Sequence, residues 1–149
     1  MVSALKWEAS LSGTQIMTTA MNSLADNTIT AASTAVDNST NLDTKAWLEL
    51  NTTYGSSPSD NAPSVDVFMA TAPDGTNYES APLTGGADQA HMYVGSFPIQ
   101  KVTSAQRIVI GPIDLPPSKF KLYLDNQTGQ AMAASGNTLD IYTDNFEAQ

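Results

Sequence analysis

Short runs of alternating apolar and polar residues recur through most of this 149-residue chain, and they constrain its fold more than any other feature. Alternation with a period of two places successive side chains on opposite faces of a β-strand. Gly, Pro, Asn and Asp residues, which form turns for known backbone reasons, separate the runs. The pattern predicts strands near residues 45–51, 64–71, 91–97, 106–111, 119–125 and 138–143.

Several short strands without a long amphipathic helix indicate an all-β protein with two packed antiparallel sheets. A jelly-roll-like β-sandwich is the preferred interpretation, and an immunoglobulin-like sandwich is the alternative. Residues 1–12 are predicted to form an N-terminal arm, and residues 13–149 a single sandwich domain. The segment from Asn27 to Val36 is β-branched but rich in alanine, so a helix is an alternative there. Pro116 and Pro117 cannot continue a central strand and predict a corner between two strands.

The phase of the alternation assigns residues to the two faces of each predicted strand. One face is aliphatic and is predicted to form the core, with Leu48, Val67, Leu122 and Leu139 among its members. Met92 and Val94 are also placed on that face. The opposite face carries a set of mostly aromatic residues: Trp47, Phe68, Tyr93, Val109, Tyr123 and Tyr142.

A sheet face that contacts only water would be polar, so these outer aromatic residues need an explanation. The first is that the arm, the long loops or neighbouring subunits cover them. The second is an aromatic platform that stacks on sugar rings. The third is a strand phase that is wrong by one residue, which would exchange the two faces. Under the first explanation, the candidate interface residues come from the outer face and from the arm. They are Trp47, Phe68, Tyr93, Tyr123 and Tyr142 of the outer face, and Leu5, Trp7 and Leu11 of the arm.

Composition argues against several functional classes. Six basic residues against 15 acidic ones give a net charge of −9, without the basic cluster that nucleic-acid binding requires. Charged residues make up only 14% of the chain, which suits permanent contact with other proteins. Cysteine is absent, which excludes disulfides and thiolate chemistry. No signal peptide is recognised, and no window approaches the roughly 20 apolar residues of a membrane helix.

Catalytic and metal-binding patterns are equally sparse, so no catalytic residue, metal ligand or cofactor is predicted. His91 is the single histidine, and no nucleophile-elbow motif accompanies it. Glu49 beside Trp47 superficially resembles a sugar cleft, but no second carboxylate has a matching setting for glycoside hydrolysis. The loop residues Ser59, Asp60 and Asn61 offer oxygen ligands for calcium but lack EF-hand spacing. Three N-x-S/T sequons, at Asn38, Asn51 and Asn126, are attributed to the abundance of Asn and Thr.

The C-terminal part of the chain resembles small virion proteins of tailed bacteriophages. The similarity rests on "RIVIGPIDLPPSKFKLYLDNQTGQAMAASGNTL" with the terminal strand after it, and on "MATAPDGTNYE" upstream; it covers about residues 64–149. The resemblance implies a non-enzymatic head decoration, or cement, protein on the virion surface, made in the bacterial host cytoplasm. It also implies contacts with the major capsid protein and with further copies of the chain, with a homotrimer favoured. The alternative is a carbohydrate-binding or receptor-contact module on the virion.

Overall fold

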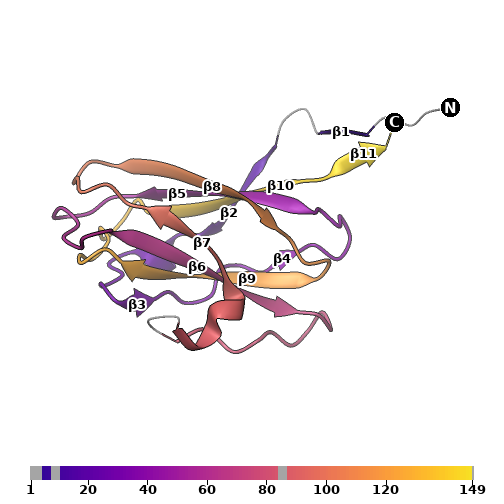
Figure 1. The fold of residues 1–149 in the computed structure, drawn as a ribbon, viewed down its shortest axis with the longest axis horizontal. Coiled ribbons are helices and arrows are strands. Elements are labelled where there is room, and N and C mark those ends of the chain that lie inside the picture. Colours follow the sequence, from indigo (N-terminus) through magenta and orange to yellow (C-terminus); the bar gives the residue numbers. More distant parts are fainter. Residues whose placement is uncertain (1–4, 8–10, 84–86, 149) are drawn as a thin grey trace.

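The computed structural model describes residues 5–7, 11–83 and 87–148, which form two packed antiparallel sheets (Figure 1). The sheet at the top of Figure 1, here called the upper sheet, has the order β2 (Gly13–Met17), β10 (Thr138–Asp144), β5 (Lys45–Thr52) and β8 (Gln106–Asp114). In the lower sheet, β3 (Thr28–Ile29) and β4 (Val36–Asp37) both pair with β9 (Lys119–Gln127), followed by β6 (Ser64–Ala72) and β7 (Tyr93–Pro98). Two 3-10 helices, η1 (Thr19–Met21) and η2 (Ala87–Met92), lie between strands.

The winding of the chain is that of a jelly roll. If β3 and β4 count as one interrupted strand, successive strands from β2 to β10 alternate between the sheets, except that β6 and β7 are neighbours in the lower sheet. This order produces the two four-strand layers of the jelly-roll architecture. The predicted all-β, jelly-roll-like sandwich is therefore confirmed, and the six strands predicted from alternation match β5 to β10 closely.

The predicted inner face forms the core. Leu48, Leu50, Val67 and Leu122 are fully buried between the sheets, and Val94 packs against this cluster from its edge. The strand phase is thus correct for β5, β6, β9 and β10, which removes a register slip as the explanation for their outer aromatic residues. In β7 the phase shifts at an irregularity, because Phe97 is fully buried in the main core opposite Val65. The placement of Met92 beside Val94 is wrong, because Met92 ends η2 and is buried in a second cluster with Phe68 and Tyr123.

The segment from residue 28 to 37 is extended rather than helical. Its backbone amides at Thr30 and Ser33 donate to the carbonyls of Leu124 and Leu122, each at 2.9 Å. In return the amides of Leu122 and Leu124 donate to the hydroxyl oxygens of Ser33 and Thr30, both at 2.9 Å. Side-chain hydroxyls thus replace two backbone acceptors, so β3 and β4 are short although the whole segment lies beside β9.

The double-proline corner connects β8 to β9, as predicted. The buried amide of Asn38 holds this corner, because its Nδ2 donates to the carbonyls of Pro116 and Asp43, both at 2.8 Å. Its Oδ1 accepts the amide hydrogen of Asp43 at 2.8 Å. One side chain therefore joins the loop after β4 to the corner before β9.

The two ends of the described chain leave the sandwich together. Strand β1 (Leu5–Trp7) pairs antiparallel with β11 (Phe146–Ala148), and Trp7 lies opposite Phe146. Figure 1 shows this pair, here called the terminal ribbon, extending away from the two sheets. The segment predicted as an N-terminal arm thus shares the ribbon with the C-terminal strand.

Candidate functional site

The outer faces of the two sheets differ in how far the chain itself covers them. On the lower sheet, Phe68 and Tyr123 are buried with Ala70 and Met92, and residues of the β3–β4 segment pack over them. Tyr93 lies at the edge of this cluster, 47% exposed, with its ring edge-on to Phe68 at a centroid distance of 5.8 Å. Phe68 and Tyr123 consequently have little surface left for a partner.

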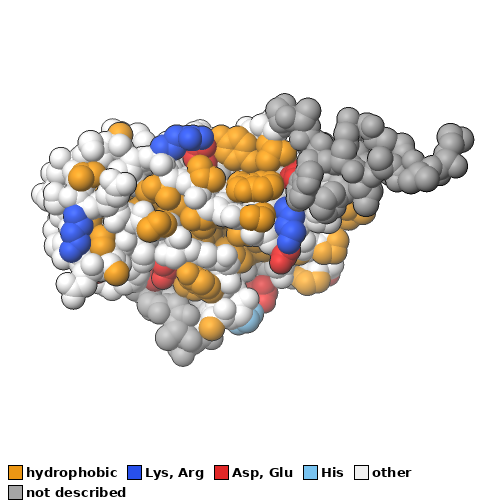
Figure 2. All heavy atoms as spheres, turned by 45° about the horizontal axis from the view of Figure 1, so that its top comes forward, with side chains coloured by type: hydrophobic (Ala, Val, Ile, Leu, Met, Phe, Trp, Pro, Cys, Tyr) orange, Lys and Arg blue, Asp and Glu red, His pale blue; other side chains and the backbone are white. Residues whose placement is uncertain are grey.

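The outer face of the upper sheet carries an apolar surface that is only partly covered. A shallow depression of about 300 Å³ lies there, and we call it the aromatic platform; its lining residues are Leu11, Trp47, Glu49, Arg107, Val109 and Tyr142. Val109 is 47% exposed. Figure 2 shows hydrophobic side chains gathered on this side of the molecule, beside a basic and an acidic side chain.

Two glycines bring the aromatic rings of the platform close to the sheet. Gly13 lies opposite Tyr142, and a Cβ atom on Gly13 would be only 2.6 Å from ring atoms Cε1 and Cζ of Tyr142. Gly111 has φ of +136°, and a Cβ atom there would be 3.1 Å from Cδ1 of Trp47. The register of β5 and β8 shifts beside Trp47, which is how a β-bulge re-aims a side chain. The positions of both rings therefore depend on neighbours without side chains.

A buried carboxylate fixes the polar side of the platform. Glu49 is only 6% exposed, and its two oxygens accept from Arg107, Nε at 2.8 Å and Nη2 at 2.5 Å. Asn51 Nδ2 and the Tyr142 hydroxyl also donate to it, each at 3.2 Å. The hydrogen bonds from Arg107 lower the pKa of Glu49 and raise that of Arg107. The bidentate geometry gives the guanidinium one fixed orientation.

This arrangement does not suit Glu49 as a general acid. A general acid of glycoside hydrolysis needs a raised pKa, whereas the pKa of Glu49 is lowered. His91 lies apart from the platform residues, with Nε2 3.4 Å from Oε1 of Glu79, and both side chains are substantially exposed.

Oxygen-rich loops are occupied by the chain itself. The Ser59 hydroxyl donates to the carbonyl of Gly129 at 3.0 Å, and the Asp60 amide donates to Thr128 at 3.3 Å. No group of three or more His, Cys, Asp or Glu residues within the described ranges is placed to hold a metal ion. The sequon residues Asn38 and Asn126 are buried, so neither could carry a glycan in this fold.

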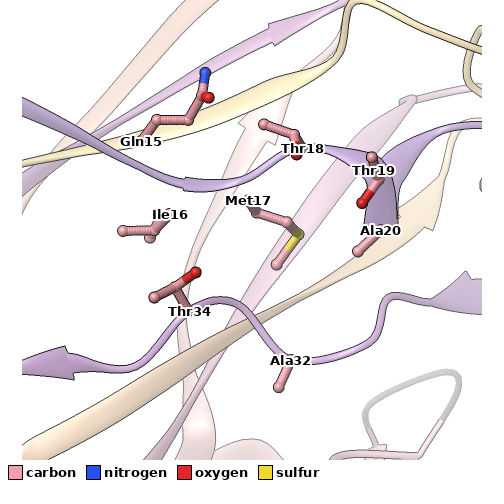
Figure 3. Close-up of a pocket in the computed structure, with 8 residues that line it drawn as sticks. All are labelled: Gln15, Ile16, Met17, Thr18, Thr19, Ala20, Ala32 and Thr34. Carbon is pink, nitrogen blue, oxygen red and sulfur yellow. The ribbon is translucent and has the colours of Figure 1, made fainter.

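The open edge of the sandwich contains two further hollows of about 260 Å³ each. The first lies between β2 with η1 and the facing segment around residues 32–34; Figure 3 shows its lining by Gln15, Ile16, Met17, Thr18, Thr19, Ala20, Ala32 and Thr34. The second continues along the same edge toward Asp37 and Asp43. The amide of Thr34 donates to the carbonyl of Ile16 at 2.9 Å and joins the two sheets between the hollows.

The residues proposed from sequence thus fall into three groups. Leu11, Trp47 and Tyr142 come together in the platform, while Phe68 and Tyr123 are buried on the other sheet and Tyr93 lies at its edge. For Leu5 and Trp7 only the backbone is described, within β1, so their side-chain contacts lie outside the described part. The sequence did not reveal that Arg107 pairs with Glu49, because this contact depends on the register between β5 and β8.

Comparison with known proteins adds no assignment: no family model, no curated protein and no solved structure matches this chain. Within the described residues, no helix has the length and apolar character needed to cross a membrane.

Proposed function

We propose that this chain is a non-enzymatic structural protein of a tailed-phage virion, and specifically a decoration protein that cements the head. It would bind the major capsid protein and further copies of itself, with a trimer as the favoured assembly. The proposal draws on the resemblance of residues 64–149 to phage virion proteins and on the jelly-roll fold. Jelly rolls occur in viral capsid proteins and also in lectins, so the fold alone does not assign the role.

The terminal ribbon is the observation that carries this proposal. Both ends of the described chain extend from one end of the sandwich as an isolated two-stranded pair. Such a pair is marginally stable in water on its own, so it gains most from a surface on another chain. Attachment through the ribbon would leave the sandwich intact as a rigid body on the capsid.

The test is a deletion of residues 1–10, which removes β1 but keeps Leu11 in the platform. The variant is expected to keep the β-sheet circular dichroism spectrum and its thermal midpoint within about 3 °C, since the core strands are untouched. Its occupancy on phage heads that lack the native protein should fall at least tenfold, as measured by sedimentation and gel densitometry.

A matched control is Leu83→Ser, which removes a 64% exposed apolar side chain from the loop after β6. This variant should bind heads like the unmodified chain. Full occupancy by the deletion variant would refute attachment through the ribbon. Absence of the unmodified chain from purified virions would refute the virion role itself.

A further inference from the structure

The aromatic platform contains a buried ion pair that is not needed to cover an apolar sheet face. Burying a carboxylate costs free energy unless it is paired. Glu49 is buried on an outer face, at a position that an apolar residue could fill without this cost. The effect of this carboxylate is to hold two groups at the border of the depression, the Arg107 guanidinium and the Tyr142 hydroxyl. A binding site needs this kind of fixed polar border.

Arg107 has donors left after it pairs with Glu49. Its Nε and one Nη2 hydrogen bond hold the carboxylate, while its side chain is 67% exposed. A guanidinium has five N–H donors, so the others face outward in one orientation. They can donate to hydroxyl oxygens of a ligand that lies on the apolar floor.

The apolar floor consists of Trp47, Val109 and Tyr142, with Leu11 at its side. Because Gly13 and Gly111 leave room, the Tyr142 and Trp47 rings lie close against neighbouring strands instead of standing away from them. Tyr142 is the direct cross-strand neighbour of Trp47 in the register of β10 and β5. Both rings line the depression, so its floor offers aromatic surface on which another flat, apolar face can stack.

We propose that the aromatic platform binds one pyranose ring of a neutral saccharide. The C–H face of the sugar lies on Trp47 and Tyr142, and its hydroxyl oxygens accept hydrogen bonds from Arg107. A depression of about 300 Å³ is at the small end of ligand sites, which suits a single ring. This binding activity goes beyond the structural role and does not depend on it.

The charges around the platform favour a neutral saccharide over an acidic one. Glu49 neutralises Arg107, and Asp140 lies directly opposite Glu49 in the next strand. The chain as a whole carries −9, so an anionic sugar would approach against the field. A protein partner is disfavoured by size, because a stable interface takes in about 20–30 residues on each side, whereas six residues line this depression.

The experiment titrates the full chain with defined neutral probes, namely the tetrasaccharides of glucose, galactose, mannose and N-acetylglucosamine, and with tetragalacturonate as the acidic probe. Binding is followed by isothermal calorimetry and by the fluorescence of a Trp7→Phe chain, in which Trp47 is the remaining tryptophan. Saturable binding of at least one neutral probe is expected. No binding to any neutral probe, or binding of the acidic probe alone, overturns the proposal.

Four variants locate the site. Trp47→Ala should weaken binding at least tenfold, and Val109→Arg should abolish it by filling the depression from an exposed position that does not support the core. Arg107→Lys should weaken binding several-fold, because an ammonium cannot hold the same bidentate geometry. The control Tyr93→Ala, an exposed ring on the other sheet, should bind like the unmodified chain. Unchanged binding in Val109→Arg overturns the proposal even if Trp47→Ala fails to fold.

Discussion

Asn126 provides a direct test of how the polar end of the core is held together. Its side chain is fully buried, and Nδ2 donates to the carbonyls of Leu24 at 3.0 Å, Ala25 at 3.2 Å and Gln130 at 2.8 Å. Its Oδ1 accepts from the hydroxyl of Thr128 at 2.7 Å. One amide thus connects the loop before β3 to the turn after β9.

Asn126→Ala removes an amide whose two hydrogens are shared among three carbonyls and whose oxygen accepts one hydrogen bond. The Leu24 carbonyl keeps the Met132 amide as a donor, and the Thr128 hydroxyl, no longer bonded to Asn126, can donate to the Gln130 carbonyl. The loss in free energy of unfolding is then close to the net value of three hydrogen bonds, about 1 kcal/mol each, or about 3 kcal/mol in total. For a chain of this length the thermal midpoint should fall by roughly 10 °C.

Urea denaturation followed by circular dichroism measures this loss. The matched control is Asn77→Ala, which removes one hydrogen bond from an exposed amide to Asp74 and should change the free energy of unfolding by less than about 0.5 kcal/mol. If Asn126→Ala and the control lose the same free energy within error, the reasoning about this buried amide is refuted.

Three further predictions follow from single contacts. Gly111→Ala should lower the free energy of unfolding by about 1–3 kcal/mol, because φ is +136° and the new Cβ would lie 2.9 Å from the Ala46 carbonyl oxygen. The control is Gly55→Ala, in which the new Cβ has no heavy atom within 4 Å. Equal stability of the two variants would contradict this prediction. Tyr123→Ala should lower the free energy of unfolding measured in urea by about 3 kcal/mol, because this ring is buried within its own chain. A loss below about 1 kcal/mol would show that the ring is not buried there. Because the pKa of Glu49 is lowered in the folded state, its ionised form adds to the free energy of unfolding above the unfolded pKa, and this addition is lost as pH falls through the folded pKa. The difference in free energy of unfolding between the unmodified chain and Glu49→Gln should therefore shrink toward low pH. A constant difference from pH 7 to pH 2 would exclude this linkage.

The strands with regular alternation could be predicted from sequence, and the others could not. In the middle of β5, β6 and β9, alternate residues such as Leu48, Val67 and Leu122 are apolar and buried, so period and burial indicate the same structure. The segment from residue 28 to 37 lacks this pattern, since Thr30 and Ser33 replace backbone acceptors with hydroxyls. The pairing of β1 with β11 joins opposite ends of the chain, and no local pattern encodes it.

The candidate site could be predicted only in part, for a similar reason. The outer position of Trp47 and Tyr142 follows from strand phase alone. Whether an outer ring stays accessible depends on distant segments: Ile29 and Ala32 cover the rings of the lower sheet, and no described segment covers the upper platform to the same extent. The pairing of Glu49 with Arg107 likewise requires the cross-strand register.

The strand order has a consequence for synthesis on the ribosome. The inner strands β9 and β10 are each made after the strands that flank them in the sheet. The amides that donate to the Ser33 and Thr30 hydroxyls, those of Leu122 and Leu124, lie 89 and 94 residues later in the sequence. The lower sheet cannot close before residue 127 has left the exit tunnel, and the upper sheet cannot close before residue 144 has done so. Until then the growing chain exposes unpaired strand edges. The scarcity of charge that suits a densely packed assembly gives these edges little protection, so slow translation should favour aggregation of the nascent chain over its folding.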